Sequence, residues 1–555
     1  MIEAILPRPP RDADAGTLDD RFWDLVEARF RRLVTEHPET ATFGGLHHAD
    51  DRLADASRDA VLDDIAKDKA HLAAIRAIDP GQLSASVRFE RDLEIHNLEL
   101  SLFHEDVLRI WARRSTAVES IGDALFVLFA RDFAPLADRL ASMTGRLEAI
   151  PTALAQHRTR AAVPQVRLWQ QLELETLHEM PSLFAELVAA GNGVLGEREQ
   201  RRLESAAEKA NVAIAEHGTW IEGSFDNAVD DWAIGPEKLD ELVRLRGFDG
   251  LTTDQILGIG YEQLSLNHVG RHHAAYEIDP NGRELDVVER LKEAHPATFA
   301  EALAGYQTAM MRARDYIIEK DLVTVPAGEQ IHVIETPEYA RNLIPFAAYF
   351  EPARFDAVPL GIYIVTPSVG HDPSAMREHN YSSISNTSIH EAYPGHHLQL
   401  AAALANPSLT RFQADAPEFV EGWAMYCEQM MREEGFDAGP EFRLAMHTDA
   451  IWRASRIILD IRMHRGDLSI EGATDFLVRE TRFERANAQA EVHRYSYTPT
   501  YQLSYLLGKT LILGLREDER KRLGSSFSLR DFHDTLMRNG SLPISFHRRL
   551  LRGEG

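Results

Sequence analysis

Residues 388–399 read Ser-Ile-His-Glu-Ala-Tyr-Pro-Gly-His-His-Leu-Gln and bring three histidines and one glutamate close together. A His-Glu pair followed by a second His one helical turn later presents two imidazoles to zinc, and the glutamate between them faces the metal-bound water. In this chain the residue four places after His390 is Pro394. The stretch therefore predicts a metal site only if the chain departs from a regular helix at this proline.

Two histidines, His396 and His397, are candidates for the second metal ligand. In a regular helix the fourth residue lies about 6 Å along the axis and on the same face, whereas His396 lies about 9 Å and His397 about 10.5 Å from His390. Pro394 breaks a helix, and Gly395 tolerates unusual backbone angles. A two-residue bulge there brings His396 into place, and a three-residue bulge brings His397. We predict His396, with His397 as the alternative.

A third protein ligand holds a catalytic zinc and leaves one position for water. The predicted helix 415–434 offers Glu418, Glu421 and Glu428. Glu421 has apolar neighbours on both sides, so its carboxylate is expected to face inward, where a charge is costly unless it is paired or bound to a metal. We predict Glu421 as the third ligand. Glu428, seven residues later, is expected to support a ligand histidine from behind.

The composition limits the classes of partner and location. A net charge of −27 argues against nucleic acid and against an anionic membrane surface. Cys427 is the one cysteine, so no intrachain disulfide forms, and we expect it to be a small buried side chain. The first 20 residues lack a targeting pattern, and no run approaches the roughly 18 apolar residues of a membrane span. We therefore expect a cytoplasmic protein with no membrane partner.

The chain is predicted to be mostly α, with one small β-sheet next to the metal-site helix. Short β-branched runs bounded by Pro or Gly predict strands at 330–336 and 360–366. A weak boundary at 225–250 separates an N-terminal helical region, 1–235, from a catalytic zinc-binding region, 236–555; the alternative is one continuous fold with a central cleft. Apolar periodicity predicts helices at 18–36, 57–78, 86–112, 132–150, 166–190, 196–222, 253–279, 296–318, 387–404, 415–434, 440–466, 470–482 and 498–515.

Two motifs resemble known families. Residues 421–426, Glu-Gly-Trp-Ala-Met-Tyr, resemble the glutamate helix of gluzincin peptidases, in which the Glu is the third zinc ligand. Residues 390–397, in the pattern HExxPGHH, resemble the signature of the bacterial domain-of-unknown-function family 885, which is regarded as zincin-like and mostly helical. Dipeptidyl-peptidase III is a parallel, since its zinc helix also has an insertion before the second His. The resemblance includes 22–45, 333–337, 344–349, and Arg494-Tyr495 followed by Pro499, Gln502, Tyr505 and Gly508. It implies a large helical zincin-like fold that holds Zn²⁺.

This interpretation gives individual residues a role. Zinc lowers the pKa of its water and polarises the scissile carbonyl. Glu391 takes the water proton and later gives it to the leaving amine. Tyr495 is predicted to stabilise the oxyanion, with Tyr497 and Tyr505 as alternatives. Arg494 is predicted to hold a substrate carboxylate through its bidentate fork.

Tyr505 and Gln502 are further candidates for substrate binding. The common Pro-Gly/Ala-Gln triplet of family 885 is replaced here by Pro-Thr-Tyr-Gln at residues 499–502, which ends in Gln502. We predict a zinc-dependent hydrolase, a metallopeptidase that cleaves short peptides. The alternatives are a zinc amidase acting on a non-peptide metabolite and a non-catalytic helical binding protein. The sequence does not predict the oligomeric state.

Overall fold

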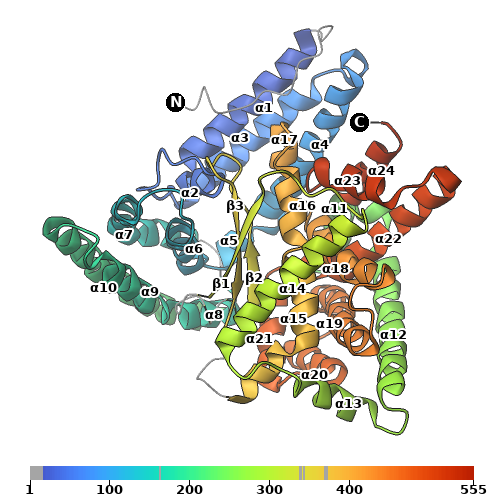
Figure 1. The fold of residues 1–555 in the computed structure, drawn as a ribbon. Helices are drawn as coiled ribbons and strands as arrows, with labels where there is room; N and C mark the ends of the chain where they lie inside the picture. The colour runs from blue at the N-terminus through green and yellow to red at the C-terminus, as the bar shows by residue number, and fades with distance from the viewer. Residues whose placement is uncertain are drawn as a thin grey trace. The chain divides into compact units, whose positions relative to one another are not determined.

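The protein is mostly α-helical with one three-stranded sheet, as Figure 1 shows for the computed structural model, and this confirms the predicted fold class. The structure describes residues 17–161, 164–336, 341, 344, 346–367 and 373–554. Residues 1–16, which are most of the 20-residue segment without a targeting pattern, lie outside this range, as do Pro337 and Pro345 of the family resemblance. The chain divides into two compact units, the first formed by Met1–Trp232 with Ala353–Pro359 and the second by Ala233–Pro352 with Leu360–Gly555.

The first unit is built from helices. They are α1 (Thr17–Glu36), α2 (Pro38–Phe43), α3 (Arg58–Arg76), η2 (Pro80–Gln82), α4 (Ala85–Leu102), η3 (Phe103–Leu108), α5 (Ile110–Arg113), α6 (Ala117–Ala130), α7 (Leu136–Arg158), α8 (Arg167–Leu177), α9 (Met180–Gly191), α10 (Glu197–Ser224) and η4 (Phe225–Asn227). The predicted helix 166–190 is two helices, because Pro181 lacks an N–H and stands in the first turn of α9. The sequence missed α6, which is apolar on most sides and so lacks an amphipathic pattern.

The second unit holds the sheet and the remaining helices. They are α11 (Pro236–Arg246), η5 (Phe248–Gly250), α12 (Thr253–Ile278), α13 (Glu284–Lys292), α14 (Phe299–Glu319), β1 (Gln330–Glu335), β2 (Ala347–Phe350), β3 (Leu360–Val365), η8 (Pro373–His379), α15 (Tyr381–Glu391), α16 (His396–Ala403), α17 (Leu409–Phe412), α18 (Pro417–Glu433), α19 (Pro440–Arg465), α20 (Ile470–Thr481), α21 (Arg485–Tyr495), η9 (Tyr501–Leu503), α22 (Ser504–Leu523), η10 (Gly524–Ser526), α23 (Leu529–Arg538) and α24 (Ile544–Leu551).

The sheet has the strand order β1-β3-β2. β3 is central and mostly buried; it pairs with β1 in parallel, with Gln330 opposite Leu360, and with β2 in an antiparallel register. The sequence predicted β1 and β3 but missed β2, which has only four residues. α14 contacts β1 and α15, so the sheet stands beside the helix that carries His390, as expected.

One hydrophobic core joins α14, the sheet, α15, α16, α18 and α22, with Ile389, Leu398 and Trp423 fully buried in it. α18 and α22 approach each other through two glycines. A Cβ on Gly508 would lie 1.9 Å from the carbonyl oxygen of Glu418, and a Cβ on Gly422 would lie 2.6 Å from the Cα of Gly508. This close approach holds the start of α22 against the helix that carries Glu421.

Candidate metal centre

The predicted helix 387–404 is wrong as a single element, because the chain forms two helices, α15 and α16, separated by Ala392–Gly395. The amide of Gly395 donates to the carbonyl of Ile389 at 3.0 Å, and the amide of Leu398 donates to the carbonyl of Ala392 at 3.3 Å. Both bonds span six residues instead of the four of an α-helix. The break therefore inserts two residues between the turns that carry His390 and His396.

The break requires Gly395 for reasons of space. A Cβ at this position would lie 1.9 Å from the carbonyl oxygen of His390 and 2.3 Å from that of Ile389. The Tyr393–Pro394 peptide bond in the break is cis. Trp423 of α18 donates its indole N–H to the carbonyl of Pro394 at 2.8 Å, and this hydrogen bond attaches the break to α18.

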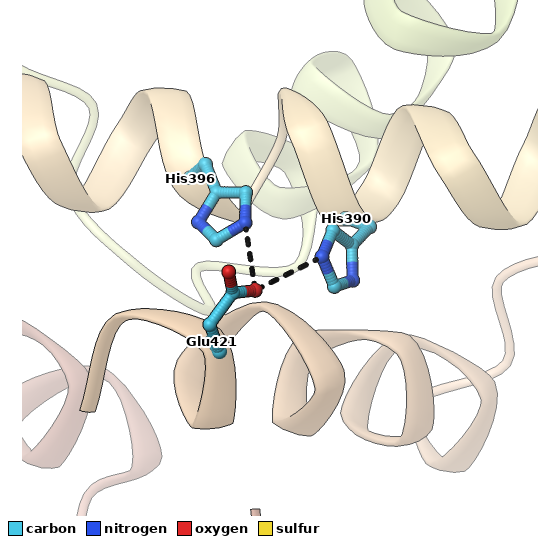
Figure 2. A group of neighbouring side chains, drawn as sticks. All are labelled: His390, His396 and Glu421. Carbon is cyan, nitrogen blue, oxygen red and sulfur yellow. Dashed lines mark ion pairs between the residues drawn. The ribbon is translucent and has the colours of Figure 1, made fainter. Parts of the chain in front are cut away.

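The break brings His390, His396 and Glu421 together, as Figure 2 shows. The Oε2 atom of Glu421 lies 3.6 Å from Nε2 of His390 and 3.3 Å from Nε2 of His396. The two imidazole rings stand nearly perpendicular, with their centroids 4.8 Å apart. One ligand-type atom from each residue lies within 4.8 Å of the other two, so these side chains can hold one metal ion.

The centre is buried, and its carboxylates and imidazoles shift one another's pKa. Burial alone would raise the pKa of Glu421, but the imidazoles of His390 and His396 outweigh it and hold this pKa well below its usual range. Burial disfavours a charged His390, yet Glu421 and Glu428 together raise its pKa to about 10. The Oε2 atom of Glu421 has no hydrogen-bond partner in the described chain, because both contacts to imidazole nitrogens are long for hydrogen bonds. A buried carboxylate oxygen without a hydrogen-bond partner is costly unless a cation binds it.

Glu428 stands behind His390. Its Oε1 atom lies 2.7 Å from Nδ1 of His390, and Asn386 donates an amide N–H to its Oε2 atom at 3.0 Å. The same amide group of Asn386 lies 3.1 Å from Asp449 of α19. When His390 donates its Nδ1–H to Glu428, the lone pair of Nε2 points towards Glu421.

His397 belongs to a separate cluster. Its Nδ1 lies 2.9 Å from the hydroxyl of Tyr349, and its Nε2 lies 2.8 Å from Oε2 of Glu329. The same carboxylate accepts a hydrogen bond of 2.5 Å from Tyr393 and one of 3.2 Å from Arg314. Both ring nitrogens of His397 are thus engaged, and the structure does not bring this side chain to the ligand group.

Glu391 is the last residue of α15 and follows His390 directly. Its side chain is half-buried, and it has no hydrogen bond or ion pair with any other residue that the structure describes. Against the effect of burial, the charge of Glu391 adds to those of Glu421 and Glu428 in raising the pKa of His390. The carboxylate of Glu391 is therefore free and close to the centre.

Tyr501, which the sequence interpretation gave no role, reaches the centre. Its hydroxyl lies 3.3 Å from Oε1 of Glu421, and its ring packs edge-on against Tyr505 with centroids 6.0 Å apart. Burial and the charge of Glu421 raise the pKa of Tyr501 to about 12. The only signal in the sequence was its place in the Pro-Thr-Tyr-Gln stretch, where the chain departs from the family triplet. The predicted oxyanion residue, Tyr495, instead donates to Glu491 at 2.7 Å and accepts from Arg456 at 3.0 Å.

The predicted substrate-binding residues have internal partners. Arg494 donates to Glu491 at 3.0 Å, and Gln502 donates its side-chain amide to Thr498 at 3.0 Å. The predicted helix 498–515 begins later, at Ser504, because Thr500 adopts a left-handed conformation with φ of 67°. Both Arg494 and Gln502 support the loop before α22.

A second group of ligand-type side chains lies in the first unit and consists of Glu36, His37 and Asp64. Arg32 lies 2.9 Å from Asp64, and Lys67 lies 2.8 Å from Glu36. These cations already balance the carboxylates, so we assign no metal to this group.

The chain belongs to the family described as "Bacterial protein of unknown function (DUF885)", whose model matches residues 38–551. This confirms the family part of the resemblance. Two solved structures share the fold. One is a candidate lipoprotein of unknown function from Shewanella oneidensis, with 23% identity and a TM-score of 0.78 over 96% of this chain and 99% of that one. The other is a candidate lipoprotein from Colwellia psychrerythraea, with 20% identity and a TM-score of 0.76 over 97% and 99%. No curated protein matches the chain.

These comparisons correct one prediction. The cytoplasmic location expected from the sequence is wrong, because both solved structures are described as lipoproteins. The prediction was made from the lack of a targeting pattern and of a membrane span, and these two absences do not determine a compartment. Among the helices that the structure describes, none has the length and apolar character needed to cross a bilayer.

Proposed function

We propose that this protein is a zinc-dependent hydrolase, a metallopeptidase of the gluzincin type that cleaves short peptides. The observation that carries the proposal is the spacing of the ligand atoms of His390, His396 and Glu421. Two atoms that each lie about 2.1 Å from a tetrahedral zinc are about 3.4 Å apart. The two His–Glu separations are 3.6 and 3.3 Å.

The residues fit zinc in kind as well as in spacing. Two histidines and one glutamate form a ligand set of catalytic zinc sites and leave a fourth position free. The unsatisfied Oε2 of Glu421 supplies the negative charge, and Glu428 orients His390. When bound, zinc would supply Lewis acidity towards a water molecule and a peptide carbonyl.

Glu391 is the proton carrier in this proposal. Its carboxylate is adjacent to the ligand His390 and is not engaged by any other described residue. It takes a proton from the attacking water and delivers it to the leaving nitrogen as the C–N bond breaks, while the hydroxyl adds to the acyl carbon. One water is consumed, and an acid and an amine are released.

Tyr501 is the donor that we assign to the developing oxyanion, in place of Tyr495. Its hydroxyl is already within reach of Glu421, and a pKa of about 12 keeps the phenol protonated at neutral pH. A donor held beside the reacting carbonyl stabilises the transition state more than the ground state. Tyr495 lacks this freedom, because its hydroxyl is bound by Arg456 and Glu491.

The test is hydrolysis of a short-peptide mixture by the zinc-loaded full chain, followed by mass spectrometry. We expect Glu391→Gln to lower kcat by about 10²–10⁴-fold and to retain zinc. Glu262→Gln, an exposed substitution on α12, serves as the control and should retain full activity. Absence of peptide cleavage by the zinc-loaded wild type, with cleavage of amide metabolites instead, would identify an amidase. Absence of both activities would support a binding protein.

A further inference from the structure

Three arginines of the second unit lie beside the candidate metal centre, and two of them share the carboxylate of Glu491. Arg456 of α19 donates to Glu491 at 2.9 Å and to the hydroxyl of Tyr495 at 3.0 Å. Arg494 of α21 donates to the same oxygen of Glu491 at 3.0 Å. The third arginine, Arg453, has neither an ion pair nor a hydrogen bond with any residue of the described chain, and its Nε is buried without a partner.

The position of Arg453 on α19 shows which way it faces. Asp449, Arg453, Arg456 and Asp460 follow one another at intervals of four, three and four residues, so they share one face of the helix. Asp449 contacts Asn386 of α15, and Asp460 accepts the backbone N–H of Thr500 at 2.9 Å. Arg453 therefore lies between the helix that carries His390 and the loop that carries Tyr501.

The electrostatics agree with this placement. The charge of Arg453 lowers the pKa of Glu428, against the effect of burial and together with His390. Burial raises the pKa of Asp449 to about 6, and Arg453 opposes this shift. The guanidinium of Arg453 is thus close to the carboxylate that holds His390.

The guanidinium of Arg453 lies over an aromatic ring. Its central carbon lies 3.9 Å from the ring centroid of Trp452 and 6.0 Å from that of Tyr505. The ring of Trp452 is half-buried. An arginine that lies over an aromatic face still has N–H groups that can bind a planar, bidentate acceptor.

We propose that Arg453 binds the free C-terminal carboxylate of the peptide, so that cleavage occurs near the C-terminus. The proposal rests on the proposed hydrolase function. It replaces Arg494 as the carboxylate receptor, because Arg494 already has Glu491 as its partner. Hydrolysis adds a hydroxyl to the acyl carbon and a proton to the leaving nitrogen. The fragment beside Arg453 is therefore an amino acid or short peptide with a new amine and its original carboxylate.

The experiment compares the tetrapeptide Ala-Leu-Ala-Phe as a free acid and as a C-terminal amide, using the zinc-loaded full chain. A hydrogen bond to a charged group contributes about 1.5–3 kcal/mol, which corresponds to a preference for the acid of about 10- to 100-fold in kcat/KM. Arg453→Met should abolish this preference, because it lowers kcat/KM for the acid by about 10- to 100-fold more than it lowers kcat/KM for the amide. Arg462→Met, on the same helix, is the matched control and should keep the preference.

Binding of the same two peptides to the zinc-loaded Glu391→Gln variant separates this inference from the hydrolase proposal. Tighter binding of the acid that disappears in the Glu391→Gln, Arg453→Met double variant supports the carboxylate site even if no peptide is cleaved. Equal binding of acid and amide overturns the inference, although zinc-dependent cleavage would still support the hydrolase. An equal loss for both peptides in Arg453→Met also overturns it, because that pattern reports a structural role.

Discussion

The amide nitrogen of Gly395 lies 3.0 Å from the carbonyl oxygen of Ile389, six residues earlier in the chain. A regular helix would make this bond over four residues. The extra two residues move His396 into the place that the fourth residue after His390 would otherwise occupy. The whole candidate centre depends on this one local departure.

Replacing Gly395 by alanine should disrupt the break. The new Cβ would lie 1.9 Å from the backbone oxygen of His390, and backbone atoms cannot move aside without separating α15 from α16. We expect the free energy of unfolding to fall by about 2–3 kcal/mol and the zinc affinity to fall as well. Thermal unfolding and zinc titration measure these two effects. Gly514→Ala in α22 is the control, since nothing lies within 4 Å of its Cβ, and it should be neutral or slightly stabilising. Equal behaviour of the two variants would contradict the role of the break.

The two adjacent histidines should differ in their effect on metal binding. His396→Ala removes an atom 3.3 Å from Glu421 and should weaken zinc binding by more than about 100-fold, since the loss of an outer partner alone costs 10–100-fold. His397→Ala removes the partner of Glu329 and Tyr349 and should lower the melting temperature with little change in zinc affinity. Competition with a chromogenic chelator measures both affinities. The opposite ranking would assign the ligand to His397.

Glu428 should affect the zinc affinity of the centre although it is not itself a ligand. Glu428→Gln removes the charge that lies 2.7 Å from Nδ1 of His390, and we expect zinc affinity to fall by about 10–100-fold. Glu434→Gln, an exposed change one residue past the end of α18, should leave the affinity unchanged. If Glu428→Gln bound zinc as tightly as the wild type, the assigned tautomer of His390 would be wrong.

Substitutions of Tyr501 and Tyr495 should separate the effects on catalysis from the effects on stability. Tyr501→Phe removes the hydroxyl nearest Glu421 and should lower kcat by about 10²-fold while zinc stays bound. Tyr495→Phe breaks bonds to Arg456 and Glu491, so it should lower the melting temperature and change kcat by less than about threefold. Steady-state kinetics together with thermal unfolding distinguish the two. A large kcat effect for Tyr495→Phe with none for Tyr501→Phe would restore the assignment made from the sequence.

The first unit should lose stability at high pH through His47. Its ring stacks on Phe133 and lies 2.8 Å from both Asp50 and Asp356. Burial alone would lower the pKa of His47, but the two carboxylates raise it from 6.5 to about 9. The stabilisation is therefore complete below pH 6.5 and is lost as the pH rises through about 9.

The measurement for His47 is the free energy of unfolding at pH 6 and pH 10, compared with His47→Gln. Between these two pH values the free energy of unfolding should fall by about 2 kcal/mol more in the wild type than in the variant, allowing for solvent screening of a half-buried ring. Equal losses in both proteins would show that the imidazolium does not stabilise the unit.

The sequence predicted the features that depend on local pattern. The helical class, β1, β3 and the meeting of the α15 and α18 regions follow from apolar periodicity, β-branched runs and the buried position expected for Glu421. The two-residue insertion followed from Pro394 and Gly395, but the sequence did not predict two separate helices. That outcome depends on the indole of Trp423 and the long bond to Ile389, which are tertiary contacts.

The outer parts of the site were not predictable, because they depend on which partners meet in space. Arg494 and Tyr495 read as free functional groups in the sequence, but Glu491 binds both. Tyr501 reaches Glu421 from a loop in which Asp460 accepts the backbone N–H of the left-handed Thr500. Such long-range pairing has no counterpart in residue spacing.

An anomalous difference map collected on both sides of the zinc absorption edge tests the central claim most directly. We predict one zinc peak per chain in this map, about 2.1 Å from Nε2 of His390, Nε2 of His396 and a carboxylate oxygen of Glu421. A peak coordinated by His397 and Glu329, or no zinc peak in crystals grown with zinc, would contradict it.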